Sequence, residues 1–286
     1  MSVISGGIAA RSGAGVAQIW AVVWTLLSIL PFFFIVLLAF KSTTDIYTNP
    51  VGLIDVDWRP ENFSEAWGGP PGGVGFSLFL LNTVIVTALS IALSLIIGSM
   101  TAYFLTVAGE RLRKVLMRIV LVATVTPVVM LLIPYYQASS VLGLLSNPWA
   151  LAIIYFAIVL PNTILIMYSF YLSFPKELRE ASSIDGLGAV ATFGRIVLPL
   201  SKGPMVAVAM INGFNIWGET QIAIVMLTQA QSRTIPVGLL AFQGDFQTNM
   251  GAIFAGLAIA TVPILVAYLI FQRNITKGIA LGGVFR

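Results

Sequence analysis

Long apolar runs separated by short polar segments make up most of the 286-residue chain. A hydrocarbon core about 30 Å thick needs roughly 20 apolar residues in a helix that rises about 1.5 Å per residue. Six runs reach that length. They extend approximately from Ile19 to Phe40, Leu78 to Val107, Val115 to Tyr135, Trp149 to Tyr171, Met205 to Thr228 and Met250 to Phe271. The pattern therefore predicts an all-α polytopic membrane protein with six transmembrane helices.

The most polar long run extends from Lys176 to Pro199, between the fourth and fifth apolar runs. A helical pattern in its first part ends at Gly186, a residue type that adopts the positive φ of a sharp turn without strain. Pro175 is expected in the first helical turn, where its missing N–H donor costs nothing. A second apolar element begins near Ala189 and leads to the membrane edge. The pattern predicts two short elements joined by a turn, within a loop from residue 173 to 202.

The composition agrees with a membrane protein, since 58% of the residues are hydrophobic and only 9% are charged. Soluble domains carry about 25% charged residues. The net charge of +4 does not indicate a nucleic-acid partner, because the basic residues flank apolar runs instead of forming one patch. Cysteine and histidine are both absent, which excludes a disulfide framework, a thiolate nucleophile and metal sites built from these residues.

The lysine and arginine residues indicate how the helices are oriented, because cytoplasmic loops are enriched in them. Twelve of the 15 basic residues lie in the termini and in or beside the second and fourth connections. We therefore expect a cytoplasmic N-terminal tail (residues 1–18), a transmembrane domain (19–271) and a cytoplasmic C-terminal tail (272–286). The apolar run after Arg11 is too long for a signal-peptide core, so we interpret it as a retained transmembrane helix.

The longest external connection is the loop of residues 41–75, which is acidic. Within it, residues 58–63 are expected to form an ordered loop, and the glycine- and proline-rich stretch 68–73 is expected to be a hinge. Two interpretations of this connection remain open, a solvated cap over the helices and a docking surface for an outside partner. Its acidic residues are Asp45, Asp55, Asp57, Glu61 and Glu65.

Polar residues inside the predicted spans are costly to leave facing lipid. Asn212, Asn215 and Glu219 fall at i, i+3 and i+7, which would place them on one helical face that looks inward. They could form hydrogen bonds that hold helices together, or they could line a polar pathway in which aromatic rings stack on a sugar. The further candidates for such a pathway are Asn82, Tyr135 and Trp217.

The polar loop carries a spaced motif, which reads Glu180-Ala181-Ser182, three residues, Gly186, nine residues, Ile196, one residue, Leu198-Pro199. This order resembles the EAA motif of the membrane subunits of ABC importers, with Ser182 in place of the second alanine. In that family the loop forms a coupling helix seated in a cleft of a cytoplasmic ATPase subunit. The resemblance implies a polar contact at Glu180, a slim packing surface at Ala181 and Ser182, and a turn at Gly186. The full set of ATPase-coupling residues implied in this way is Glu180, Ala181, Ser182, Asp185, Gly186 and Leu187.

The chain has no G-x4-G-K-[ST] phosphate-binding loop. We therefore expect it to bind no cofactor and no metal itself, with ATP and Mg held by partner ATPase subunits. Other stretches resemble the carbohydrate-uptake branch of the family, and specifically the second permease subunit of maltose-type systems. These stretches are Leu81-Asn82-Thr83, Phe214-Asn215-x-Trp217 and the glycine-rich tail from Gly278 to Val284.

The tail of that branch reaches the ATPase dimer interface, which implies ATPase contacts at Gly278, Gly282 and Gly283. Two positions depart from the pattern of the branch. Gly218 stands where the branch often has asparagine, between Trp217 and Glu219, and the chain ends in Val284-Phe285-Arg286 where the branch usually has Val-Lys-Gly.

The sequence thus predicts a permease subunit of an ATP-driven importer in the cytoplasmic membrane of a prokaryote, for a sugar or sugar-like solute. The expected partners are a homologous second permease subunit, an ATPase dimer, an external solute-binding protein and membrane lipid, with no nucleic acid. The alternative is a secondary transporter without an ATPase partner, for which an inverted repeat and several intramembrane acids would be typical. The solute stays open between a disaccharide, an oligosaccharide and a glycerol phosphodiester.

Overall fold

A computed structural model describes residues 6–69, 73–240 and 249–283. Within these residues the secondary structure is helical, apart from one isolated bridge between Lys41 and Trp58. The chain divides into two compact units. The first contains residues 1–70 and 242–259, and the second contains residues 71–241 and 260–286.

The first unit contains the long apolar helix α1 (Gly6–Ala39), two short helices and the beginning of α14 (Met250–Gly283). The short helices are α2 (Thr43–Thr48) and α3 (Asn62–Gly68). Lys41 organises the loop between them because its ammonium group, which is fully buried, donates to the carbonyl oxygens of Asn49, Pro50 and Gly52 at 2.7, 3.1 and 2.6 Å. Residues 41–69 therefore form an ordered structure, which confirms the ordered loop predicted around Trp58.

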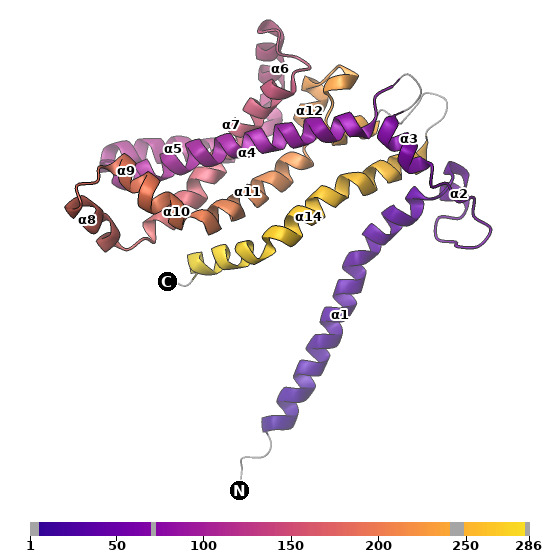
Figure 1. Cartoon of the computed structure of the whole chain (residues 1–286), viewed down its shortest axis with the longest axis horizontal. Coiled ribbons are helices and arrows are strands. Elements are labelled where there is room, and N and C mark those ends of the chain that lie inside the picture. The colour runs from indigo at the N-terminus through magenta and orange to yellow at the C-terminus, as the bar shows by residue number, and fades with distance from the viewer. Residues whose placement is uncertain (1–5, 70–72, 241–248, 284–286) are drawn as a thin grey trace. The chain divides into compact units, whose positions relative to one another are not determined.

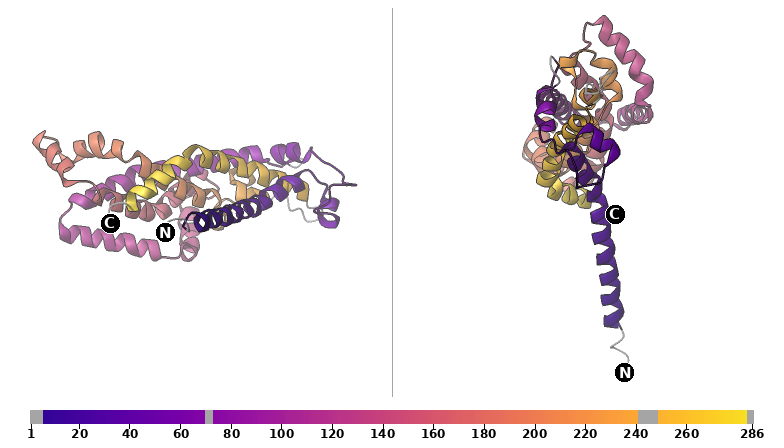
Figure 2. Two further views of the ribbon diagram at one scale, coloured as in Figure 1. Left: turned by 90° about the horizontal axis from the view of Figure 1, so that it is seen from below. Right: turned by 90° about the vertical axis from the view of Figure 1, so that its right-hand side faces the viewer.

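The second unit is organised around the pair of α4 (Phe76–Val107) and α7 (Pro148–Leu172), with α11 (Lys202–Trp217) alongside both (Figures 1 and 2). Gly98 allows α4 and α7 to approach closely, since a Cβ atom added there would lie 2.6 Å from Cγ2 of Thr163. Ser90 also joins the pair by donating a hydrogen bond to the carbonyl oxygen of Ala152 at 2.9 Å. Small and hydroxyl residues thus take the place of bulky ones at this helix contact.

The remaining elements of the second unit are shorter. They are α5 (Glu110–Val125), η1 (Val128–Leu131) and α6 (Leu132–Val141) between α4 and α7; α8 (Lys176–Ile184), α9 (Ala189–Thr192), the π-helical turn η2 (Phe193–Val197) and α10 (Leu198–Leu200) between α7 and α11; and α12 (Gln221–Met226), η3 (Ala230–Ser232) and α13 (Ile235–Leu239) after α11. Figure 1 shows α12 beside α6.

Among the described residues, four helices are long and apolar enough to cross a membrane by themselves. Two bent pairs raise this number to six if each pair counts as one span. The first pair joins residues 110–125 to 128–141 at 93°, and the second joins residues 189–200 to 202–217 at 75°. The six-helix prediction is thus compatible with the structure, although two of the predicted spans are not single helices.

Two of the predicted spans are interrupted in the structure. The third predicted span, residues 115–135, is interrupted after Val125 because Pro127 has no N–H and disfavours a helical conformation of the preceding residue. The fifth, residues 205–228, ends as a helix at Trp217, where Gly218 follows and α12 begins anew. At the other end of the chain, α14 continues as a helix to Gly283, beyond the predicted end of the apolar run at Phe271.

Candidate functional site

The loop between α7 and α11 contains the predicted turn at Gly186, which has a φ of +72°. The amide groups of Asp185 and Leu187 donate to the carbonyl oxygens of Ala181 and Ser182 at 3.0 and 2.9 Å. These bonds satisfy carbonyl groups that the end of α8 leaves without helical partners. The predicted helix end and turn are therefore confirmed, while Pro175 lies just before α8 and not within its first turn.

Ser182 links the two arms of the loop, which are α8 before the Gly186 turn and the segment from α9 to α10 after it. Its side chain is 3% exposed, and its hydroxyl accepts a hydrogen bond from the hydroxyl of Thr192, which is also 3% exposed, at 3.2 Å. Ala181 is exposed. The structure thus separates the two small residues of the motif, because Ser182 packs inside the loop and Ala181 faces outward. The side chain of Glu180 lies outside the part of the chain that the structure describes.

The outer surface of the loop carries aliphatic side chains. Ile184, at the end of α8, is 86% exposed, and Val190, in α9, is 83% exposed. Asp185 between the two arms is also exposed, and Leu187 is half-buried. Exposed aliphatic side chains gathered on a short loop are typical of a protein contact.

An aromatic cluster attaches the loop to the long helices. Phe193 of η2 lies against Tyr103 of α4 and Tyr171 of α7, with ring centroids 5.3 and 6.5 Å away. The rings of Tyr103 and Tyr171 are themselves 6.0 Å apart and perpendicular. Leu178 of α8 and Thr192 line a small cavity next to these rings. A displacement of the loop would therefore be passed directly to α4 and α7.

Hydrogen bonds between polar side chains join α7 to α11 about midway along both helices. Asn212 is 1% exposed, and its amide nitrogen donates to the hydroxyl of Thr163 at 2.8 Å. Its amide oxygen accepts from the side chain of Asn162 at 3.2 Å. For Asn212 the structure therefore favours the interpretation that it holds helices together.

The predicted polar face of Asn212, Asn215 and Glu219 does not exist. Asn215 is exposed, and its side chain bonds to the carbonyl oxygen of Ile211 in its own helix at 3.0 Å. Glu219 lies beyond the end of α11 at Trp217, so the helical spacing does not reach it. The prediction was wrong because it extended one helix across Gly218.

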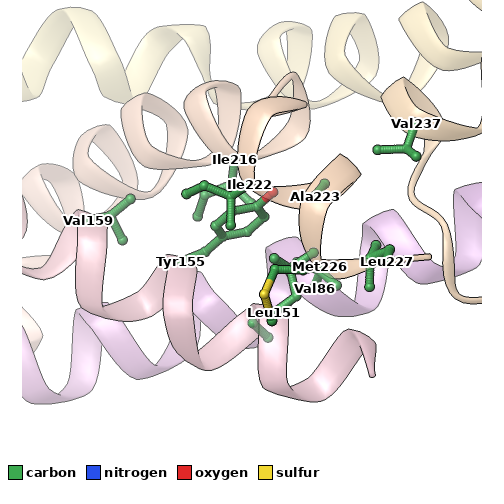
Figure 3. Close-up of a cluster of buried hydrophobic side chains, with 11 residues drawn as sticks. Val86, Leu151, Tyr155, Val159, Ile216, Ile222, Ala223, Met226, Leu227 and Val237 are labelled. Carbon is green, nitrogen blue, oxygen red and sulfur yellow. The ribbon is translucent and has the colours of Figure 1, made fainter. Parts of the chain in front are cut away.

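The carboxylate of Glu219 is occupied by groups of this chain. Oε1 accepts from the amide of Ile222 at 2.9 Å, and Oε2 accepts from the amide of Ala223 at 3.2 Å and from the hydroxyl of Tyr155. Glu219 therefore caps the first turn of α12 and joins it to α7. Figure 3 shows the Tyr155 ring pointing from α7 toward α12, between the apolar side chains of Ile216 and Ile222.

The other predicted pathway residues lie at separate places. Asn82 is 7% exposed and donates to the carbonyl oxygens of Gln231 and Arg233 at 2.8 and 3.0 Å. Trp217 donates to the carbonyl oxygen of Ala260 at 3.3 Å and lines an apolar pocket of about 260 Å³ between α4, α11 and α14. Tyr135 is half-buried and packs against the cluster of Figure 3. The structure thus does not bring the five predicted residues together around one cavity.

Sequence reasoning missed several hydroxyl side chains that connect elements, among them Tyr155, Thr163 and Thr192. Tyr155 and Thr163 lie inside an apolar run, where a hydroxyl that needs a partner would have been the signal. The predicted tail residues Gly278, Gly282 and Gly283 belong to the last turns of α14, whose side-chain surroundings lie outside the described part of the chain. In the described residues no three His, Cys, Asp or Glu side chains come close enough to hold a metal ion.

These features define a class of protein, a multi-pass helical membrane protein with a two-armed loop held against its long helices. The family model of the binding-protein-dependent transport system inner membrane component matches residues 94–281. The chain is 33% identical over 272 residues to a probable ABC transporter permease, YurM, of Bacillus subtilis (strain 168), which covers 94% of this chain and 89% of the relative. The chain therefore belongs to this family of ABC importer permeases, as the resemblance of its motif predicted.

The names of further relatives specify a solute. The diacetylchitobiose uptake permease NgcG of Streptomyces coelicolor is 29% identical, with 95% of this chain and 89% of the relative covered. The trehalose/maltose permease MalG of Thermococcus litoralis is 27% identical, with 93% and 95% covered. A chain in the crystal structure of a bacterial ABC transporter that imports alginate matches the fold with a TM-score of 0.76, at 19% identity, over 96% of this chain and 99% of that chain.

Proposed function

We propose that this permease imports a sugar or sugar-like solute and that its loop of residues 173–202 docks onto a separate ATPase subunit. The observation that supports the docking most directly is the pair of exposed aliphatic side chains, Ile184 and Val190, on either side of the Gly186 turn. Burial of two such side chains in a partner is worth about 1.5–3 kcal/mol each. ATP and Mg are bound by that partner, and ATP hydrolysis takes place there.

The shape of the loop suits this role. The Gly186 turn and the contact between Ser182 and Thr192 hold the two arms together, and the aromatic cluster around Phe193 attaches them to α4 and α7. Closure of an ATPase dimer on the loop would therefore shift helices and not merely bend a flexible connection. In this proposal the tail residues Gly278, Gly282 and Gly283 also contact the ATPase.

The solute class rests on the named relatives, whose solutes are diacetylchitobiose and trehalose or maltose. A disaccharide or an oligosaccharide delivered by an external solute-binding protein is thus the first choice. The remaining parts of the proposal are a homologous second permease subunit, a location in the cytoplasmic membrane and cytoplasmic termini. The apolar helices α4, α7 and α11 provide the lipid-embedded body in which alternating access takes place.

The docking is tested by replacing Ile184 and Val190 together with aspartate and purifying the transporter through a tag on the permease. We expect the ATPase subunit to be lost from the purified complex. The matched control is Ile54→Asp, since Ile54 is 80% exposed but lies in the external loop. Retention of the ATPase by the double variant at the level of the Ile54→Asp control would overturn the proposal.

The solute class is tested with the solute-binding protein that delivers solute to this permease, purified and titrated calorimetrically with maltose, melibiose and diacetylchitobiose. Binding of at least one of these sugars is expected. Uptake that persists after the ATPase subunit is removed would instead support a secondary transporter.

A further inference from the structure

The two helices α7 and α11 are connected at one end by the loop of residues 173–202, called the coupling loop after its proposed role, since α7 ends at Leu172 and α11 begins at Lys202. The 16 residues of α11 span about 24 Å at about 1.5 Å per residue. The far end of α11 is therefore separated from the loop by most of the thickness of a hydrocarbon core. At that far end Gly218 interrupts the helix and α12 begins.

A break of this kind leaves the first amide groups of the new helix without helical partners. In a membrane such groups need acceptors supplied by the protein. Glu219 supplies them, because its two carboxylate oxygens accept from the amides of Ile222 and Ala223. The same carboxylate accepts from the hydroxyl of Tyr155, which lies about two turns into α7. A single side chain thus caps α12 and ties it to α7.

The other end of α12 is attached to the start of α7. The amide of Ser146, two residues before α7, donates to the carbonyl oxygen of Met226 at 2.8 Å. The hydroxyl of Ser146 lies 2.8 Å from the hydroxyl of Thr228 and accepts from the amide of Gln229 at 3.0 Å. Both ends of α12 are therefore held along the first turns of α7.

We propose that Tyr155 and Glu219 are a positioning pair that joins the far ends of α7 and α11, so that both helices and α12 move as one body when the coupling loop is displaced. The near ends are joined by the loop itself, and the middle is joined by Asn212 with Asn162 and Thr163. This inference rests on the proposed function for its role in transport. The contact between Tyr155 and Glu219 stands independently of it.

The occupied carboxylate argues against direct contact between Glu219 and the solute. A carboxylate that already accepts three hydrogen bonds in a half-buried site has little acceptor capacity left. Contact with a solute would require these bonds to break, which would leave the amides at the start of α12 unsatisfied. The pair therefore acts on the position of α12 and not on the solute.

Because this chain contains no cysteine, thiol labelling of the complete transporter in membrane vesicles, followed on the separated permease chain, gives a direct test. Met226→Cys places a reporter in α12 itself, where the native side chain is 1% exposed. Ser94→Cys, at a fully buried position of α4, is the control reporter. We expect Tyr155→Phe and Glu219→Gln each to raise the labelling rate by fluorescein maleimide at position 226 about tenfold, since α12 opens locally. The rate at position 94 should stay the same.

The double variant distinguishes a joined pair from two independent residues. Once the contact is broken, the second substitution should add no more than about a further twofold. Tyr168→Phe, which removes a hydroxyl elsewhere on α7, should leave the labelling rate unchanged. An unchanged rate in Tyr155→Phe, or single effects that multiply in the double variant, would overturn the inference. Labelling of both reporters in Glu219→Gln would indicate general unfolding of that variant. In that case the labelling rate of Tyr155→Phe, which loses only one oxygen atom, decides between the two outcomes.

A second readout links the pair to transport. Because the pair makes α7, α11 and α12 move together when the coupling loop is displaced, we expect both variants to lower solute uptake per ATP hydrolysed by the purified complex, while Tyr168→Phe should not. If the unmodified permease is purified without any bound ATPase subunit, the proposed function is refuted. The labelling experiment would still report on the contact between Tyr155 and Glu219.

Discussion

The Gly186 turn offers the sharpest test of the coupling loop, because its φ of +72° is a conformation that other residues adopt only at a cost. For an L-residue with a Cβ atom, this left-handed backbone conformation costs about 1–2 kcal/mol of conformational free energy. No heavy atom lies within 4 Å of the position that a Cβ would occupy, so the backbone conformation alone carries the cost. Gly186→Ala therefore isolates the turn from any effect of packing.

The loop has little stability in reserve, since most residues on the outer face of α8 and α9 are exposed. A cost of about 1–2 kcal/mol would lower the population of the turned form by up to about 5- to 30-fold. The apparent affinity for a partner that binds only this form falls by the same factor. We expect Gly186→Ala to weaken ATPase binding by up to that amount, as measured by titrating the ATPase subunit onto the detergent-solubilised permease.

Two further variants complete this experiment. Gly186→Asn should bind the ATPase more tightly than Gly186→Ala, because asparagine tolerates a positive φ better than alanine. Gly188→Ala is the matched control, since Gly188 has a φ of −70° and also has no neighbour within 4 Å of a Cβ. Equal ATPase binding by Gly186→Ala and Gly188→Ala would refute the reasoning.

Two more predictions concern the stability of each unit, measured by thermal unfolding in detergent. Gly98→Ala should lower the free energy of unfolding by about 1–3 kcal/mol, because its Cβ would lie 2.6 Å from Cγ2 of Thr163. In the control Gly109→Ala the new Cβ meets no atom within 4 Å, so no such loss is expected. Equal losses in the two variants would contradict the close contact of α4 and α7. Lys41→Met should cost about 3 kcal/mol through its three lost hydrogen bonds. Lys114→Met, which breaks an exposed ion pair, should cost about 0.5 kcal/mol, and a similar loss in both variants would contradict the structural role of Lys41.

The sequence was sufficient for features that depend on local chemistry. The turn at Gly186 was predictable because glycine, the preceding helical pattern and the following apolar element are neighbours in the chain. The membrane class was predictable because it depends on the length and composition of runs such as Leu78 to Val107. The orientation of the spans remains a prediction from the distribution of basic residues.

Changes of direction inside apolar runs were not predictable from hydropathy. The break is marked only by the short polar stretch Gly218-Glu219-Thr220-Gln221. Because α12 is itself rich in Ile, Val and Met, the run as a whole keeps the length and mean hydropathy of a span. The helical spacing that placed Asn215 and Glu219 together assumed one continuous helix. Pro127 was visible as a signal, but a window of about 20 residues averages its effect away.

The sequence also did not predict which polar side chains pair with one another when they are far apart in the chain. Ser182 was read as part of an outer surface because its partner, Thr192, is ten residues away and is brought near only by the turn. The same applies to Tyr155 and Glu219, which are 64 residues apart. Each of these side chains needs a partner when buried, but the sequence does not specify which one.

The two arms of the coupling loop contribute differently to the connection with the membrane helices. The second arm provides Phe193, whose ring packs against those of both Tyr103 and Tyr171. The first arm provides Ser182, whose hydroxyl meets Thr192 in place of the alanine methyl group of the motif. A force on α8 therefore reaches α4 and α7 through the contact between the arms as well as through the backbone turn. The hydroxyl contact between Ser182 and Thr192 therefore shares with the Gly186 turn the task of keeping the arms in register.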